Sequence, residues 1–67
     1  MSFDKSWVKF EISRLKTDAE NVLSYVDSMY AIAELEGDRD NIIYFEELSN
    51  ALFDAVNSLR EAHSLIN

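Results

Sequence analysis

The residues best suited to chemistry are the acidic side chains around the only glycine of the sequence. Four carboxylates fall at positions 1, 3, 5 and 12 of the twelve-residue segment 36–47, namely Glu36, Asp38, Asp40 and Glu47. This is the spacing of the carboxylate ligands in an EF-hand calcium loop. Position 1 is Glu rather than the usual Asp, and position 6 is Asn41, where that loop needs glycine for a sharp turn. The segment predicts either a capped acidic turn between two helices, which we favour, or a weak calcium site.

Acidic residues also recur every seven positions along the chain. Two sets show this spacing, Glu20, Asp27 and Glu34 in the first half and Glu47, Asp54 and Glu61 in the second. Because seven residues make nearly two turns of an α-helix, each set predicts an acidic ridge along one helix face. A solvated outer surface is the favoured interpretation. The alternative is an acidic inhibitor or nucleic-acid mimic, like some small phage-encoded inhibitors, that occupies a basic groove on a partner protein.

Three aromatic side chains fall outside the apolar pattern described below and are candidates for contact with a partner protein. Trp7 and Phe10 lie near the N-terminus among basic residues, and Phe53 lies among polar residues. Exposed aromatic side chains are typical of binding hot spots. For Trp7 and Phe10 the favoured interpretation is that they close the open end of a helical bundle.

Catalysis is not expected from this sequence. His63 is the only histidine, and the sequence contains no cysteine. A single glycine provides no glycine-rich phosphate loop, and a helical hairpin brings together no serine, histidine and aspartate for nucleophilic catalysis. We therefore predict a non-enzymatic protein without a bound cofactor.

The elements that carry these residues are two amphipathic helices. Apolar residues recur at alternating steps of four and three, through Val8, Ile12, Leu15, Ala19, Val22, Val26, Met29 and Ala33 in the first helix, and through Phe45, Leu48, Leu52, Ala55, Leu59, Ala62 and Ile66 in the second. This heptad pattern predicts helices that pack along a seam. We predict helices over about 4–36 and 41–66, joined by a turn at 37–40 into an antiparallel all-α hairpin that forms one domain, 1–67.

Local signals mark the ends of these helices. Gly37 suits the left-handed position that follows a helix. Asp38 or Asp40 suits the N-cap of the second helix, and Ser2 or Asp4 suits the N-cap of the first. The turn between the helices is therefore short.

A second signal competes with one long first helix. Thr17 and Glu20 match a capping box, which would begin a new helix and give a monomeric three-helix bundle. The heptad pattern runs through Thr17 without a shift, and no glycine or proline marks a turn there. One continuous helix is therefore favoured over the three-helix alternative.

The predicted hairpin has more apolar surface than one helix pair needs. Apolar residues flank the seam from Val22 onward, whereas charged residues flank the half from Val8 to Ala19, which looks satisfied by one neighbouring helix. A dimer of hairpins, which is a four-helix bundle, would cover this surface, and two-fold symmetry is the commonest form of homo-oligomer. The predicted self-association residues are Val22, Leu23, Tyr25, Val26, Met29, Tyr30, Ile32, Ala33, Ile42 and Tyr44. A three-helix monomer and a different partner chain are the alternatives.

Composition limits the classes of partner. The 67-residue chain has a net charge of −7, which opposes direct binding to nucleic acid or to anionic lipid. The charge is segregated, with a net +2 over residues 1–16 and a net −9 over residues 17–58. The longest apolar run is far shorter than the roughly 20 residues that span a membrane. We expect a soluble, cytoplasmic homodimer that acts as a small interaction or regulatory module, with a basic protein as a further partner.

Overall fold

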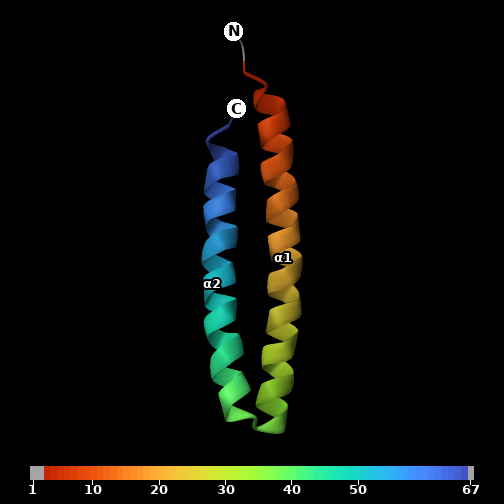
Figure 1. The fold of residues 1–67 in the computed structure, drawn as a ribbon, viewed down its shortest axis with the longest axis vertical. Coiled ribbons are helices and arrows are strands. Elements are labelled where there is room, and N and C mark those ends of the chain that lie inside the picture. The colour runs from red at the N-terminus through yellow and green to blue at the C-terminus, as the bar shows by residue number, and fades with distance from the viewer. Residues whose placement is uncertain (1–2, 67) are drawn as a thin grey trace.

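The structure is an antiparallel hairpin of two long helices. The computed structural model describes residues 3–66, which form α1 (Lys5–Glu36) and α2 (Arg39–Ser64) and no strand. The two helices lie side by side along their whole length, and the N- and C-terminal ends meet at the same end of the molecule (Figure 1). The hairpin measures 57 × 14 × 14 Å. The predicted all-α hairpin is confirmed.

Each helix end has the expected local chemistry. The Asp4 carboxylate accepts a hydrogen bond of 3.0 Å from the Trp7 backbone N–H and caps α1. Gly37 follows α1 at φ 68°, a left-handed conformation that glycine adopts without a Cβ penalty. Asp38 caps α2 by accepting from the Asn41 backbone N–H. The turn is therefore only Gly37 and Asp38, two residues shorter than predicted, and Ser2 lies outside the described residues.

The three-helix alternative is wrong, because α1 continues through Thr17 as regular helix. The side chain of Thr17 is exposed and accepts no capping hydrogen bond. Glu20, the other half of the expected capping box, instead pairs with Arg60 of α2, with 3.3 Å between Oε2 and the guanidinium nitrogen. A capping box stabilises a helix end only where the chain leaves the helix, and nothing in this segment interrupts the backbone hydrogen bonds.

The core between the helices is small. Val26 and Ala33 of α1 and Val56 of α2 are the only buried residues in the described part of the chain, with exposed fractions of 5%, 4% and 1%. Half-buried side chains extend the contact along both helices, and the apolar ones among them include Ile12, Leu23 and Tyr30 of α1 and Phe45, Leu52 and Leu59 of α2. The seam therefore has a thin apolar centre with partly exposed edges.

The seam is rotated around α1 relative to the predicted heptad stripe, whereas six of the seven stripe residues of the second half of the chain stay half-buried along it. Val8, Leu15 and Val22 were expected at the seam, but they are exposed. Leu23, expected beside the seam, is half-buried. On α2 the most buried residue is Val56, which is not part of the predicted stripe, whereas the stripe residue Ala55 is exposed. Apolar residues stand on both sides of the stripe, so its period alone does not determine which side packs against the other helix.

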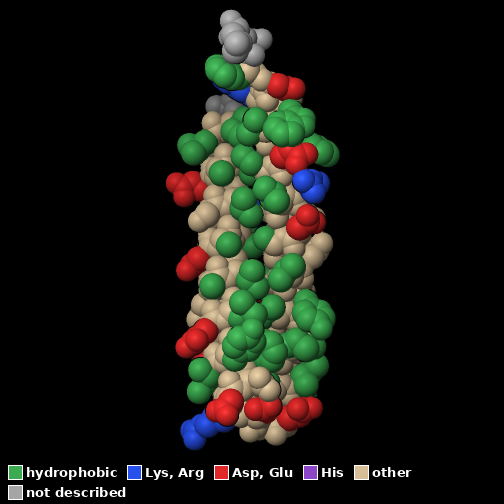
Figure 2. Space-filling model, viewed as in Figure 1, with side chains coloured by type: hydrophobic (Ala, Val, Ile, Leu, Met, Phe, Trp, Pro, Cys, Tyr) green, Lys and Arg blue, Asp and Glu red, His purple; other side chains and the backbone are tan. Residues whose placement is uncertain are grey.

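The hairpin has one polar and one apolar side. On the polar side, the Ser49 hydroxyl of α2 donates a 2.6 Å hydrogen bond to the Asp27 carboxylate of α1. Successive helical residues point about 100° apart, so Tyr25 and Asp27 lie on opposite sides of the buried Val26. The residues one position after Val26 and Val56 therefore lie on the polar side of the hairpin. The residues one position before them lie on the opposite, apolar side. Figure 2 shows a band of hydrophobic side chains running down the hairpin over both helices.

Candidate interaction surfaces

An exposed apolar face is the main surface feature of the hairpin. We define the apolar face by its exposed members, which are Val8, Leu15, Val22, Tyr25 and Ile32 of α1 and Tyr44, Ala51 and Ala55 of α2. The α1 members recur at steps of seven, seven, three and seven, and the α2 members at steps of seven and four, so each set shares one side of its helix. The large side chains in this set are 42–66% exposed. The face runs along most of the molecule.

The predicted self-association residues divide between this face and the hairpin itself. Val22, Tyr25, Ile32 and Tyr44 are exposed on the apolar face. Val26 and Ala33 are buried between α1 and α2. Leu23, Met29, Tyr30 and Ile42 are half-buried at the edges of the helix contact. The exposed members remain available for contact with another chain, whereas the buried ones stabilise the hairpin.

The half of α1 near the N-terminus also has unsatisfied apolar surface, which corrects the expectation that one neighbouring helix covers it. Val8 and Leu15 are 42% and 48% exposed, similar to Ile32 near the turn at 46%. The charged neighbours Lys9 and Lys16 are half-buried along the seam in their place. Long lysine side chains cover apolar surface with their methylene groups while the ammonium stays in water.

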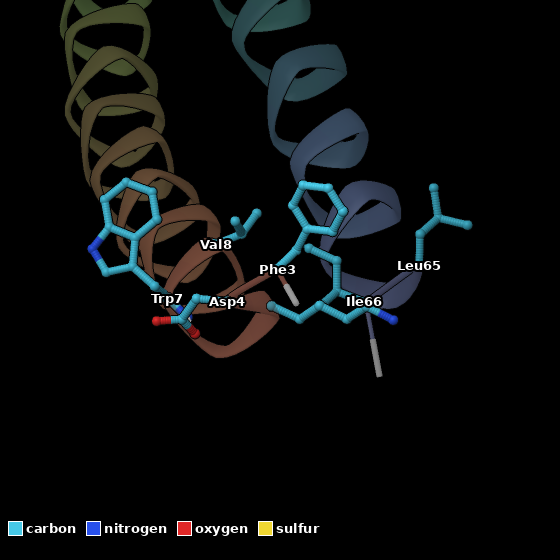
Figure 3. A pocket seen from close by; sticks show the side chains of 7 residues that line it. Phe3, Asp4, Trp7, Val8, Leu65 and Ile66 are labelled. Atoms are coloured by element: carbon cyan, nitrogen blue, oxygen red, sulfur yellow. Dashed lines mark hydrogen bonds between the residues drawn. The ribbon is translucent and has the colours of Figure 1, made fainter. Parts of the chain in front are cut away.

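A groove opens at the end of the hairpin where the two termini meet (Figure 3). This open-end groove has a volume of about 440 Å³ and is lined by Phe3, Asp4, Lys5, Trp7, Val8, Leu65 and Ile66. The Phe3 ring lies across the gap between the two helix ends, facing Ile66 (Figure 3). Trp7 lines the groove and stays 62% exposed, so it does not close the end of the hairpin. Phe10 is also exposed and lies outside the groove.

Sequence reasoning missed the part that Phe3 plays in this groove. Phe3 precedes α1, so helical periodicity assigns it to no face. Leu65 and Ile66 follow α2, and the antiparallel packing of the two helices brings them to the same end of the hairpin as Phe3. The one available signal was the aromatic spacing of Phe3 and Trp7, which stand four residues apart.

The two acidic sets have different surroundings. Glu20 and Asp27 face α2 on the polar side, where they contact Arg60 and Ser49, so they are not the outer ridge that was expected. Glu47, Asp54 and Glu61 are all exposed, and within the described chain their carboxylates take part in no ion pair or hydrogen bond. They lie on the side of α2 directed away from α1, because each is close to half a turn around the helix from the buried Val56. Only this second set forms a free acidic ridge.

Phe53 lies beside the first acidic set. It is 53% exposed and borders a shallow depression on the polar side together with Glu20, Leu23, Ser24, Asp27, Val56 and Arg60. Phe53 therefore lies next to the Val56 core and is still about half exposed.

The alternative interpretation of residues 36–47, a calcium loop, does not match the structure. Glu36 ends α1, and the segment from Arg39 through Glu47 is helical. An EF-hand loop needs twelve residues that wrap around the ion, and only two residues here lie outside a helix. Within residues 3–66, no three acidic or histidine side chains cluster in a way that would hold a metal ion. The structure supports the interpretation of this segment as a capped turn, since the Asp38 carboxylate bonds both the backbone and the side-chain amide of Asn41.

Among the described residues on the polar side, Tyr30 is the acidic side chain whose pKa is clearly shifted. The nearby carboxylate of Glu34 raises the pKa of the Tyr30 hydroxyl above its ordinary value, and partial burial and the carboxylate of Glu46 raise it further. All three causes disfavour the negatively charged phenolate. His63, the only histidine, is half-buried in the last turn of α2.

Neither described helix combines the length and apolar character that crossing a membrane requires. Comparisons with protein-family models, with curated proteins and with solved structures gave no match.

Proposed function

We propose that this chain is a non-enzymatic interaction module that self-associates through the apolar face. Two hairpins would pack face to face and form a four-helix bundle. The observation that carries the proposal is the division of the hairpin into a polar side, with hydrogen bonds between the helices, and an opposite side where large apolar residues are about half exposed. A hairpin that remains monomeric gains no stability from apolar side chains that stay exposed to water.

The size of the face supports this proposal. One side of the hairpin measures 57 by 14 Å, or about 800 Å², so it has room for the area that each partner buries in an interface of standard size. Large contiguous apolar patches on a protein surface mark interaction sites. Aromatic side chains such as Tyr25 and Tyr44 are enriched at the centres of such interfaces.

The small core supports the proposal independently. Chains below about 70–80 residues rarely obtain enough stability from one core, and they gain it from disulfides, metals or association. The sequence has no cysteine, and the hairpin buries only Val26, Ala33 and Val56. Association would complete burial of the half-exposed side chains and stabilise both helices.

Light scattering coupled to size-exclusion chromatography tests the proposal. We expect a mass of twice 7.7 kDa at tens of micromolar, because two copies associate. Val22→Lys places a charge on the apolar face and should give a folded or partly folded monomer. Asn50→Lys makes the same charge change at an exposed position on the polar side and should remain dimeric. A strict monomer in the unmodified chain contradicts the proposal.

A second candidate function is docking of the free acidic ridge on a basic protein. The observation in its favour is that Glu47, Asp54 and Glu61 are exposed on the side of α2 away from α1, where self-association would leave them accessible. Like charges about 10 Å apart along a rod would attract a basic groove over long distances at low salt.

Competition between variants tests this second function. Proteins retained from a lysate of the source organism by the immobilised chain at low salt should be lost when all three ridge residues are changed to lysine. A control with the exposed residues Asp18, Glu36 and Asp40 changed to lysine alters the net charge equally and should retain them. Retention that is unchanged at high salt contradicts this function, because exposed charges are screened within about 10 Å at 0.1 M salt.

A further inference from the structure

The open-end groove and the apolar face are continuous. Val8 belongs to both, and the groove adds Phe3, Trp7, Leu65 and Ile66 to the face at the end opposite the turn. Phe3 and Trp7 are 81% and 62% exposed, so this end offers a hollow with apolar walls rather than a closed surface. A monomeric hairpin leaves the hollow in contact with water.

The other end of the apolar face has protruding side chains. Ile32 of α1 and Tyr44 of α2 are both about half exposed there. They lie at the same level along the hairpin, because Ser49 contacts Asp27 and each residue stands five positions closer to the turn on its helix. The Tyr44 ring packs edge-on against Phe45, with ring centroids 5.2 Å apart, which holds it in place.

These two ends are symmetric about the middle of α1. The helix runs from Lys5 to Glu36, so Val8 and Ile32 each lie roughly 12 residues, or about 18 Å, from its centre. A two-fold axis that lies in the plane of the apolar face, level with that centre and perpendicular to the helices, therefore exchanges the two positions. In that arrangement the turn end of one copy lies against the open end of the other.

The charge distribution favours the same arrangement. Residues 21–51, which form the half near the turn, contain seven acids and one base, a net −6. Residues 3–20 and 52–66, which form the open half, contain six acids and five bases, a net −1. Two copies with their turns at the same end would place the two turn halves, each with a net charge of −6, beside each other. In the opposite orientation each turn half lies beside an open half with a net charge of −1. Coulomb repulsion therefore disfavours the first orientation.

We infer that the open-end groove is the seat for Ile32 and Tyr44 of a second copy, so that two hairpins pair with their turns at opposite ends. This inference rests on the self-association proposed above and names the orientation and the side chains that fill the groove. Each copy both offers a groove and fills one, which gives a closed two-fold dimer.

Cysteine cross-linking tests the orientation directly, because the chain has no cysteine of its own. Two variants are made, Val8→Cys and Ile32→Cys, and one carries an affinity tag so that mixed species differ in mass. Light scattering first measures the mass of each reduced variant. A short bismaleimide cross-linker is then added to each variant alone and to an exchanged mixture of the two. In the inferred dimer, residue 8 of one copy lies next to residue 32 of the second copy. The two copies of residue 8 are about 35–40 Å apart.

We expect a cross-linked species only in the mixture. Cross-linking of Val8→Cys alone, or no cross-linking in any sample of a dimeric protein, overturns the inferred orientation and leaves the proposed self-association standing. A monomeric mass before cross-linking overturns both.

Tyr44→Ala tests the filling of the groove. We expect the dissociation constant of the dimer to rise at least about tenfold, as for other central aromatic anchors. Phe53→Ala removes an aromatic ring of similar exposure from the polar side and should change that constant less than about threefold. Circular dichroism checks that both variants remain helical. Equal effects of the two substitutions would overturn the role of Tyr44 as the side chain that enters the groove.

Discussion

The hydroxyl of Ser49 on α2 donates a 2.6 Å hydrogen bond to the carboxylate of Asp27 on α1. This bond joins residues 22 positions apart and sets the level at which the two helices face each other. It also lies on one side of the hairpin, so that the apolar residues on the opposite side are left without a partner in the chain. The rotation of the seam and the exposure of the apolar face are therefore two aspects of one packing arrangement.

Ser49→Ala should lower the free energy of unfolding by about 0.5–1.5 kcal/mol relative to a control serine, because it removes this hydrogen bond. Ser58→Ala is the control, since Ser58 is an exposed residue of the same helix with no side-chain bond to the described residues. Both changes gain the same helix propensity, so their difference isolates the bond. Urea unfolding of both variants at one protein concentration measures it, and equal stabilities would show that the bond contributes nothing.

Val26→Asp should unfold the hairpin. Val26 is 5% exposed in the centre of the seam, and no cationic side chain pairs with that position in the described structure. Burying an unpaired carboxylate costs several kcal/mol, which exceeds the stability expected of so small a core. Asn21→Asp adds the same charge at an exposed position of α1 and should remain helical. Circular dichroism compares the two, and a fully helical Val26→Asp variant would mean that the seam lies elsewhere.

Thr17 provides a test of the continuous α1. Inside a helix, alanine is more favourable than glycine by about 1 kcal/mol, whereas at an N-cap glycine is better tolerated than alanine. Because Thr17 lies within α1, we expect Thr17→Ala to be the more stable variant and Thr17→Gly the less stable one. Thermal or urea unfolding gives the order. The reverse order would indicate that a helix begins at Thr17 in solution.

Tyr30 should make stability sensitive to alkaline pH. Glu34, partial burial and Glu46 raise the pKa of its hydroxyl in the folded state, so the folded state holds that proton more tightly than the unfolded state does. The stabilisation is complete below the unfolded pKa of about 10 and is lost as the pH rises through the higher folded pKa. Tyr30→Phe removes the titrating group and should lose less stability than the unmodified chain above about pH 10.

Tyr25→Phe is the control for this measurement, because Tyr25 lies on the apolar face, across α1 from the carboxylates that act on Tyr30. It should lose as much stability as the unmodified chain over the same range. Urea unfolding between neutral and alkaline pH follows all three proteins. Parallel losses in the Tyr30→Phe variant and the unmodified chain would rule out a contribution from Tyr30.

The sequence by itself determined the helices and the turn between them. The N-cap at Asp4, the left-handed Gly37 and the N-cap at Asp38 all depend on contacts within three to four residues, so the residue types predict Gly37 and limit the caps to Ser2 or Asp4 and to Asp38 or Asp40. The absence of proline and the unbroken heptad pattern likewise favoured a continuous α1 over a break at Thr17. These signals are local, and the structure agrees with them.

Only the tertiary structure decided which side of each helix packs inward. Apolar residues occupy adjacent columns on α1, so the period of the pattern is compatible with a seam through Val22 or one through Leu23. The hairpin buries the Leu23 side because that rotation also brings Asp27 to Ser49 and Glu20 to Arg60, which satisfies the polar groups beside the core. The same rotation leaves Val8, Leu15 and Val22 exposed. The rotation depends on two contacts between distant parts of the chain, one between residues separated by 22 positions and one between residues separated by 40, and no local sequence pattern contains such contacts.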